Sequence, residues 1–138
     1  MNIITRIENS YGSFKISLQT GQRVHSIDIP SKSSGFGSDV NGGEMLFLAM
    51  AVCYCNDLYR EAAKTNIEIT NVEVEVKGEF GSEGEPAKNV TYNAKVAARA
   101  DKKEIQKLMK HTDKVAEIQN TIRNAIPVRL KNIEAIPE

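Results

Sequence analysis

The feature that most constrains the fold of this chain is a run of eleven apolar residues from Met45 to Cys55. A membrane span needs roughly 18 apolar residues, so the run suits a buried helix instead. Asn41 precedes the run, and Glu44 follows Asn41 by three residues, which is the spacing of a capping box. Because neither Pro nor Gly occurs between Glu44 and Lys64, we predict a helix from about Gly43 to Lys64.

The first half of this helix is apolar on all sides, and such a helix must be covered on every face. A chain of 138 residues has few elements to supply that cover, so we predict a homodimer in which a second subunit supplies part of it. Polar residues return only after Cys55. We expect Asp57, Arg60, Glu61 and Lys64 to mark the end of the helix that reaches solvent.

Alternating apolar and polar residues predict strands in two regions. Three short stretches lie within the first thirty residues and predict an antiparallel meander: Ile3 to Ile7, Phe14 to Leu18 and Val24 to Ile29. The clearest alternation runs from Val72 to Phe80 and from Val90 to Ala98, on either side of the turn-forming cluster Gly81 to Pro86. It predicts a long hairpin with one apolar face on the core.

The last third of the chain predicts a second long helix. Asp101 and Glu104 repeat the capping spacing, an apolar stripe at helical spacing follows, and the helix must stop before Pro127. We expect a break near Asp113 and a final strand at Val128 to Asn132. With a long surface loop from Pro30 to Gly43, the order of elements predicts a single α+β domain over residues 1–138, with antiparallel sheets and two long helices.

Charge and composition exclude several classes of function. Eighteen Lys and Arg balance eighteen Asp and Glu, so no net field draws the chain to nucleic acid or to an anionic membrane. The start of the chain, Met1 to Arg6, lacks the pattern of a secretory signal, and we expect a cytoplasmic protein.

Metal and disulfide chemistry have equally little support in the sequence. Cys53 and Cys55 are the only cysteines, and two helical residues spaced in this way point about 200° apart, so we expect no disulfide between them. His25 and His111 lie far apart, and no spacing typical of a zinc site occurs. We expect neither a metal nor another cofactor.

Two segments nevertheless resemble a known family. The segment Gly42 to Cys53, an acidic residue and an apolar run closed by a cysteine, is similar to the central helix of the OsmC/Ohr family. The segment Leu108 to Val128, especially Thr121 to Val128, resembles the second helix of that family with its closing Pro-Val strand. The resemblance implies an intertwined homodimer that reduces organic hydroperoxides during oxidative stress with a pair of cysteines. Cys53 matches the first of these, whose thiolate attacks the peroxide.

The sequence departs from the family pattern at three places. The second cysteine of the family would fall at Ala116, which is followed by Glu117, so the family's disulfide cycle is impossible here and an external thiol must act instead. The family's catalytic glutamate would fall at Gly43, with Glu44 next to it. The family's activating arginine comes from the N-terminal strands, where this chain has Arg6 and Arg23.

Each candidate catalytic residue therefore has two interpretations. Cys53 is either a nucleophile or a small buried hydrophobe. Glu44 either orients an arginine or polarises a peroxide, or it only caps its helix. Arg23 either lowers the pKa of Cys53 from a partner chain or is a solvated side chain.

Two functions stay open on these grounds. The chain is either a thiol-dependent peroxidase that uses Cys53 with an external thiol reductant, or a non-catalytic dimeric module that binds a small apolar ligand at the subunit interface. A nucleic-acid-binding domain is disfavoured by the zero net charge and by the 6% of aromatic residues.

Overall fold

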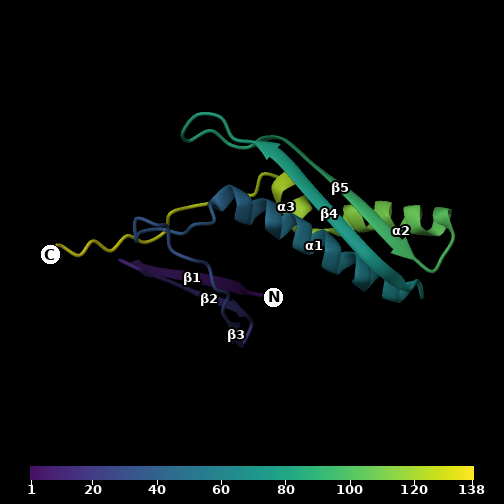
Figure 1. Ribbon diagram of the computed structural model, residues 1–138, viewed down its shortest axis with the longest axis horizontal. Helices are drawn as coiled ribbons and strands as arrows, with labels where there is room; N and C mark the ends of the chain where they lie inside the picture. Colours follow the sequence, from purple (N-terminus) through teal and green to yellow (C-terminus); the bar gives the residue numbers. More distant parts are fainter. The chain divides into compact units, whose positions relative to one another are not determined.

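The computed structural model describes residues 1–138, and internal contacts divide them into two compact units, Met1–Leu46 and Phe47–Glu138. The chain contains three helices and two antiparallel sheets, one with three strands and one with two (Figure 1). This is the predicted α+β class. None of the helices combines the length and the hydropathy that a membrane span requires.

The first unit contains the predicted meander. Strands β1 (Ile3–Ser10), β2 (Ser13–Thr20) and β3 (Arg23–His25) pair antiparallel in the order β1-β2-β3. Gly12 closes the first turn with a φ of +68°, a backbone conformation that favours glycine. The third strand stops at His25, four residues before the predicted end, and the chain then runs as a loop with a single bridge between Ser31 and Ser38.

Helix α1 (Gly42–Lys64) begins at the predicted capping box. The Glu44 N–H donates to Asn41 Oδ1 at 2.8 Å, and the Asn41 N–H donates to Glu44 Oε2 at 3.1 Å. Two of the otherwise unpaired N–H groups of the first turn and its cap are satisfied in this way. The helix then continues without interruption for 23 residues, as the absence of Pro and Gly after Gly43 predicts.

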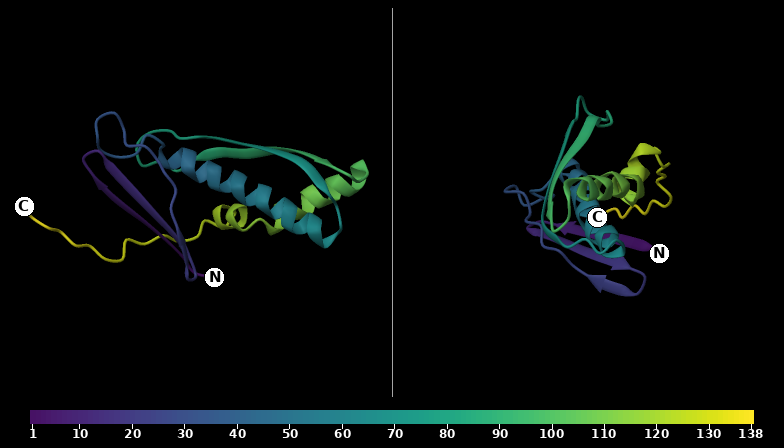
Figure 2. Two further views of the ribbon diagram at one scale, coloured as in Figure 1. Left: turned by 60° about the horizontal axis from the view of Figure 1, so that its bottom comes forward. Right: turned by 90° about the vertical axis from the view of Figure 1, so that its right-hand side faces the viewer.

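The second unit contains the predicted hairpin of β4 (Ile69–Glu79) and β5 (Lys88–Ala98). Side chains alternate between half-buried and exposed along both strands, and the three helices lie on one side of the hairpin (Figure 2). Gly78 is required by a close approach, because a Cβ there would lie 2.5 Å from the Phe47 ring. That ring stacks on Phe80 with centroids 5.8 Å apart, so α1 meets the hairpin at this point.

The core of the second unit forms where α1, the hairpin and the C-terminal helices meet. Its buried residues come from α1, from α2 (Lys102–Val115) and from the junction before α3 (Glu117–Arg123): Tyr54, Leu58, Ala62, Leu108 and Ala116. Apolar residues of both hairpin strands pack against them. The Tyr54 hydroxyl also donates to the Met109 carbonyl at 2.9 Å, which joins α1 to α2.

The second helix begins at its predicted capping box but breaks later than predicted. The Glu104 N–H donates to Asp101 Oδ1 at 2.8 Å, and the Asp101 N–H donates to Glu104 Oε2 at 3.2 Å. The break falls at the extended Ala116, not near Asp113. Asp113 caps nothing, because its carboxylate accepts from the Tyr92 hydroxyl and the Arg123 guanidinium.

The predicted final strand at Val128 to Asn132 is wrong for the single chain. These residues have no regular secondary structure, and Val128 and Leu130 are 95% and 83% exposed. The segment continues to the C-terminus as an irregular chain (Figure 1). A strand needs a neighbour for its N–H and C=O groups, and no strand of this chain pairs with the segment.

The expectation that the polar end of α1 reaches solvent is also wrong for two of its residues. Asp57 is 6% exposed and Glu61 is 4% exposed. Both carboxylates are ion-paired, which makes their burial tolerable. Apolar residues in the first half of α1 are exposed instead: Leu46, Leu48 and Val52 are 39%, 55% and 48% exposed in the single chain.

Candidate functional site

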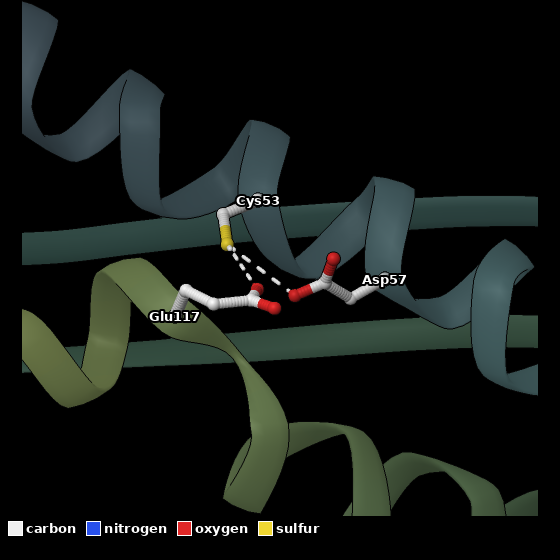
Figure 3. Close-up of side chains that lie close together, drawn as sticks. All are labelled: Cys53, Asp57 and Glu117. Atoms are coloured by element: carbon white, nitrogen blue, oxygen red, sulfur yellow. Dashed lines mark hydrogen bonds between the residues drawn. The ribbon is translucent and has the colours of Figure 1, made fainter. Parts of the chain in front are cut away.

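The sulfur of Cys53 lies beside two carboxylates (Figure 3). Cys53 Sγ is 3.4 Å from Asp57 Oδ2 and 3.9 Å from Glu117 Oε2. Cys53 and Asp57 are four residues apart on α1, so their side chains share one face of the helix. Glu117 is the first residue of α3, and the break at Ala116 brings it to that face.

Arg60 forms ion pairs with the Asp57 and Glu117 carboxylates through the oxygens that do not face the sulfur. Its Nη1 lies 2.9 Å from Asp57 Oδ1 and 3.0 Å from Glu117 Oε1. The remaining oxygens, Asp57 Oδ2 and Glu117 Oε2, face the sulfur. Arg60 Nε also pairs with Glu61 Oε2 at 2.9 Å, so a single guanidinium orients three carboxylates.

The surroundings of Cys53 raise the pKa of its thiol. Burial is the largest cause, and the negative charges of Asp57 and Glu117 raise the pKa further, whereas the backbone N–H of Ile118 lowers it. No cation acts directly on the sulfur. The thiol is therefore protonated at neutral pH, and its hydrogen points to Asp57.

The two carboxylates differ in basicity. Burial is the largest cause that raises the pKa of Asp57, and the neighbouring Glu117 raises it further. The pKa of Glu117 is lowered, first by its own backbone N–H and then by the Asp57 and Arg60 side chains. Asp57 is consequently the stronger base of the two and also the nearer one to the sulfur.

The same three residues are the group in this structure whose donor atoms converge closely enough for a metal ion. Sγ and the carboxylate oxygens all lie within 4.8 Å of one another. However, Arg60 already pairs with both carboxylates, and it supplies the positive charge that an ion would otherwise bring. The arrangement favours proton transfer between the thiol and a carboxylate over metal binding.

The structure places the three predicted catalytic residues as follows. Cys53 is half-buried in the middle of α1, Glu44 lies in the first turn of α1 with its Oε2 on the Asn41 N–H, and Arg23 opens β3 opposite Thr20. Glu44 and Arg23 belong to the first unit, and Cys53 belongs to the second. The side chains in contact with the sulfur are Asp57 and Glu117.

Sequence reasoning did not select Asp57, Arg60 or Glu117. Two signals were available. Asp57 follows the candidate cysteine by four residues, and Glu117 follows Ala116, the position of the missing second cysteine. The break at Ala116 turns that second position toward α1, so the residue beside it contacts Cys53.

Cys55 is in a different environment. Both cysteines are free, and Cys55 lines a shallow pocket against β4 with Ala51, Val52, Asn56, Val72 and Val74. The two cysteine side chains therefore lie on different faces of α1, as their two-residue spacing predicts.

Comparison with known proteins agrees with this fold. A family model described as OsmC-like protein matches residues 35–131. The chain is similar to the solved structure of an OsmC-like protein from Mycoplasma pneumoniae, with 16% identity over 89% of each chain and a TM-score of 0.60. No curated protein matches the sequence.

Two further solved structures carry names that refer to peroxide resistance. The organic hydroperoxide resistance protein OhrB of Bacillus subtilis shares 17% identity over 89% of this chain and 91% of its own, with a TM-score of 0.54. An organic hydroperoxide resistance protein OsmC from Legionella pneumophila shares 17% identity over 89% and 90%, with a TM-score of 0.51. At these identities the likeness shows the fold, and the family model covers well over half of the sequence. The chain belongs to the OsmC-like protein family.

Proposed function

We propose that this protein reduces organic hydroperoxides with Cys53 as the reacting thiol and with an external thiol as the reductant. The observation that carries the proposal is the placement of Cys53, half-buried in α1 with a carboxylate oxygen 3.4 Å from its sulfur. A cysteine that served only as a small hydrophobe would lie among apolar side chains. The names of the similar proteins from Bacillus subtilis and Legionella pneumophila support the same class of substrate.

The reaction begins with the transfer of one oxygen atom. The Cys53 sulfur attacks the terminal oxygen of the hydroperoxide, the O–O bond breaks, and the products are Cys53 sulfenic acid and an alcohol. The sulfur is oxidised by two electrons and the peroxide is reduced by two. One proton moves from the thiol to the departing alkoxide.

The sulfenic acid must then be reduced from outside the chain, because Ala116 stands where the family has its second cysteine. A first external thiol forms a mixed disulfide with Cys53 and releases water. A second external thiol attacks this mixed disulfide, which restores the Cys53 thiol and releases the oxidised reductant. The reducing cytoplasm, where we expect the protein, contains such thiols.

Glu44 and Arg23 enter this proposal as activating residues. Glu44 uses Oε2 in the helix cap, which leaves Oε1 for an arginine. Arg23 lies at the start of a short exposed strand. In the proposed homodimer, Arg23 of one copy would bring its positive charge to Cys53 of the other copy. Such a charge would lower the pKa of Cys53 against the two carboxylates.

A homodimer is part of the proposal. Large apolar side chains are exposed in both units of the single chain, among them Ile3, Ile7, Leu46, Leu48 and Val52. Exposure of so many apolar groups is characteristic of an association surface. Light scattering at micromolar concentration should give twice the 15.3 kDa mass of one chain, and a mass of 15.3 kDa would contradict the dimer.

Peroxide consumption tests the proposed activity directly. Reduced protein, tert-butyl hydroperoxide and a small monothiol should consume peroxide with turnover, and Cys53→Ser should abolish that turnover. Cys55→Ser is the matched control and should retain it. Consumption that does not exceed that of the monothiol alone, or that survives in Cys53→Ser, would reject the activity.

The environment of Cys53 leaves room for the second function, a non-catalytic module that binds a small apolar ligand. The thiol of Cys53 is protonated at neutral pH, which makes it a weak nucleophile unless a base assists it. If the protein lacks peroxide turnover but binds an apolar fluorescent probe at one site per subunit, this second function replaces the first.

A further inference from the structure

The carboxylate of Asp57 is fixed in place against the thiol of Cys53. Its Oδ1 pairs with Arg60 Nη1 at 2.9 Å, one turn along the same helix, and its Oδ2 lies 3.4 Å from the sulfur. The residue is 6% exposed. Because an arginine holds one oxygen of this carboxylate, the other oxygen stays directed at the sulfur. Figure 3 shows that oxygen of Asp57 facing Cys53.

The proposed reaction includes two proton transfers in which a carboxylate placed in this way can take part. The thiol proton must leave the sulfur as the S–O bond forms, and the departing alkoxide, which is a strong base, must gain a proton as the O–O bond breaks. A positioned side chain that does both within one site accelerates the step by roughly 10²- to 10⁴-fold.

We propose that Asp57 carries this proton: Oδ2 accepts it from Cys53 Sγ during attack on the hydroperoxide and delivers it to the alkoxide. The inference rests on the proposed function. Atoms and electrons balance in this step. The thiol and the hydroperoxide become a sulfenic acid and an alcohol, and Asp57 is a carboxylate before and after it.

The groups around Asp57 suit this role. Cys53 and Arg60 face it from α1, and Glu117 faces it from α3. Burial, followed by the charge of Glu117, raises its pKa, which makes it a better proton acceptor than an ordinary aspartate. Glu117 itself is the poorer candidate, because its oxygen is 3.9 Å from the sulfur and its pKa is lowered.

Reaction with two different electrophiles distinguishes proton transfer by Asp57 from a purely electrostatic effect of its charge on Cys53. Alkylation by iodoacetamide depends on the thiolate and releases iodide, which needs no proton. Oxidation by tert-butyl hydroperoxide needs a proton on the leaving group. In a Cys55→Ser background, Asp57→Asn should therefore speed alkylation of Cys53 at neutral pH, because one nearby negative charge is gone, and should slow its oxidation by about 10²-fold.

The matched control is Asp28→Asn, an exposed aspartate of the first unit, which should change neither rate. The inference is overturned if Asp57→Asn oxidises at the wild-type rate or faster, whatever its alkylation rate. If wild-type Cys53 itself oxidises no faster than free cysteine, the proposed function has failed. Fast wild-type oxidation that Asp57→Asn retains defeats the inference alone.

A series of hydroperoxides keeps the inference testable if Asp57→Asn does not fold. The wild-type protein should oxidise hydroperoxides at rates that depend only weakly on the acidity of the alcohol released, because Asp57 protonates the leaving oxygen. Free cysteine under the same conditions supplies the reference dependence. A dependence as steep as that of free cysteine would overturn the inference.

Discussion

At the scale of single residues, the chemistry of this chain centres on how one thiol is placed among charges. Two adjacent carboxylates, those of Asp57 and Glu117, lie beside the Cys53 sulfur, and the guanidinium of Arg60 pairs with both of them. This arrangement keeps the thiol protonated at neutral pH, and the Asp57 carboxylate is the base that accepts its proton in the proposed reaction. Within the single chain no cation acts on the sulfur, so the positive charge that the proposal assigns to Arg23 would have to come from a second copy.

Glu117→Gln tests that electrostatic description. Removal of the Glu117 charge should lower the pKa of Cys53, so the pH at which iodoacetamide alkylation reaches half its maximal rate should move down. Glu83→Gln, in the exposed hairpin turn, is the control and should leave the alkylation profile unchanged. An unchanged or raised midpoint in Glu117→Gln would show that its charge does not act on Cys53.

A buried carboxylate makes stability depend on pH. Ion pairs with Lys64 and Arg60 and the contact with His111 lower the pKa of Glu61 to about 2. Because the folded pKa lies below the unfolded value of about 4.3, the stabilisation is fully present above pH 5 and is lost as the pH falls toward 2.

Urea unfolding at pH 6 and at pH 3 measures this dependence. The free energy of unfolding should fall between these pH values by less in Glu61→Gln than in the wild type. The exposed Glu75→Gln should behave as the wild type does. Equal losses in wild type and Glu61→Gln would contradict the role of Glu61.

At the scale of elements, local sequence patterns predicted most of the structure. The capping boxes at Asn41 and Asp101 begin their helices as expected, and the alternation from Val72 onward forms the hairpin. These signals are local, so the sequence contains them completely. Interactions between elements were less predictable: polar residues after Cys55 suggested a solvated helix end, but partners from α2 and α3 bury Asp57 and Glu61.

The contact between α1 and the hairpin gives an element-scale prediction. A Cβ at Gly78 would lie 2.5 Å from the Phe47 ring, so Gly78→Ala should destabilise the protein by about 1–3 kcal/mol as the ring is displaced. Gly42→Ala is the control, because nothing lies within 4 Å of its added Cβ. Thermal unfolding of both variants checks this, and equal stability of Gly78→Ala and wild type would mean that Phe47 repacks freely.

At the scale of the whole molecule, the sequence did not predict the structure of the C-terminal segment correctly. Alternation from Val128 to Asn132 predicts a strand. Alternation shows only that a segment can pair, however, and in the single chain this segment pairs with no strand. Val128, Leu130, Ile133 and Ile136 are all largely exposed. The proposed homodimer provides a place for these side chains, since a second copy brings further strand edges.

Removal of residues 128–138 tests that relation. If the segment contributes to the dimer, the truncated protein should dissociate at higher concentrations than the full chain, as measured by light scattering over a dilution series. The full-length double variant Leu130→Ser and Ile133→Ser is the control, because it removes two apolar side chains and keeps the backbone of the segment. A truncated protein that stays as fully dimeric as the full chain would exclude the segment from the interface.

The most direct test is the rate constant for a single turnover of Cys53 with tert-butyl hydroperoxide at neutral pH, followed by mass spectrometry in Cys55→Ser. We predict sulfenic acid at Cys53 at a rate well above that of free cysteine, although iodoacetamide alkylates the same thiol more slowly than it alkylates free cysteine. Oxidation no faster than that of free cysteine would contradict the proposal that this half-buried thiol beside Asp57 reacts with peroxides.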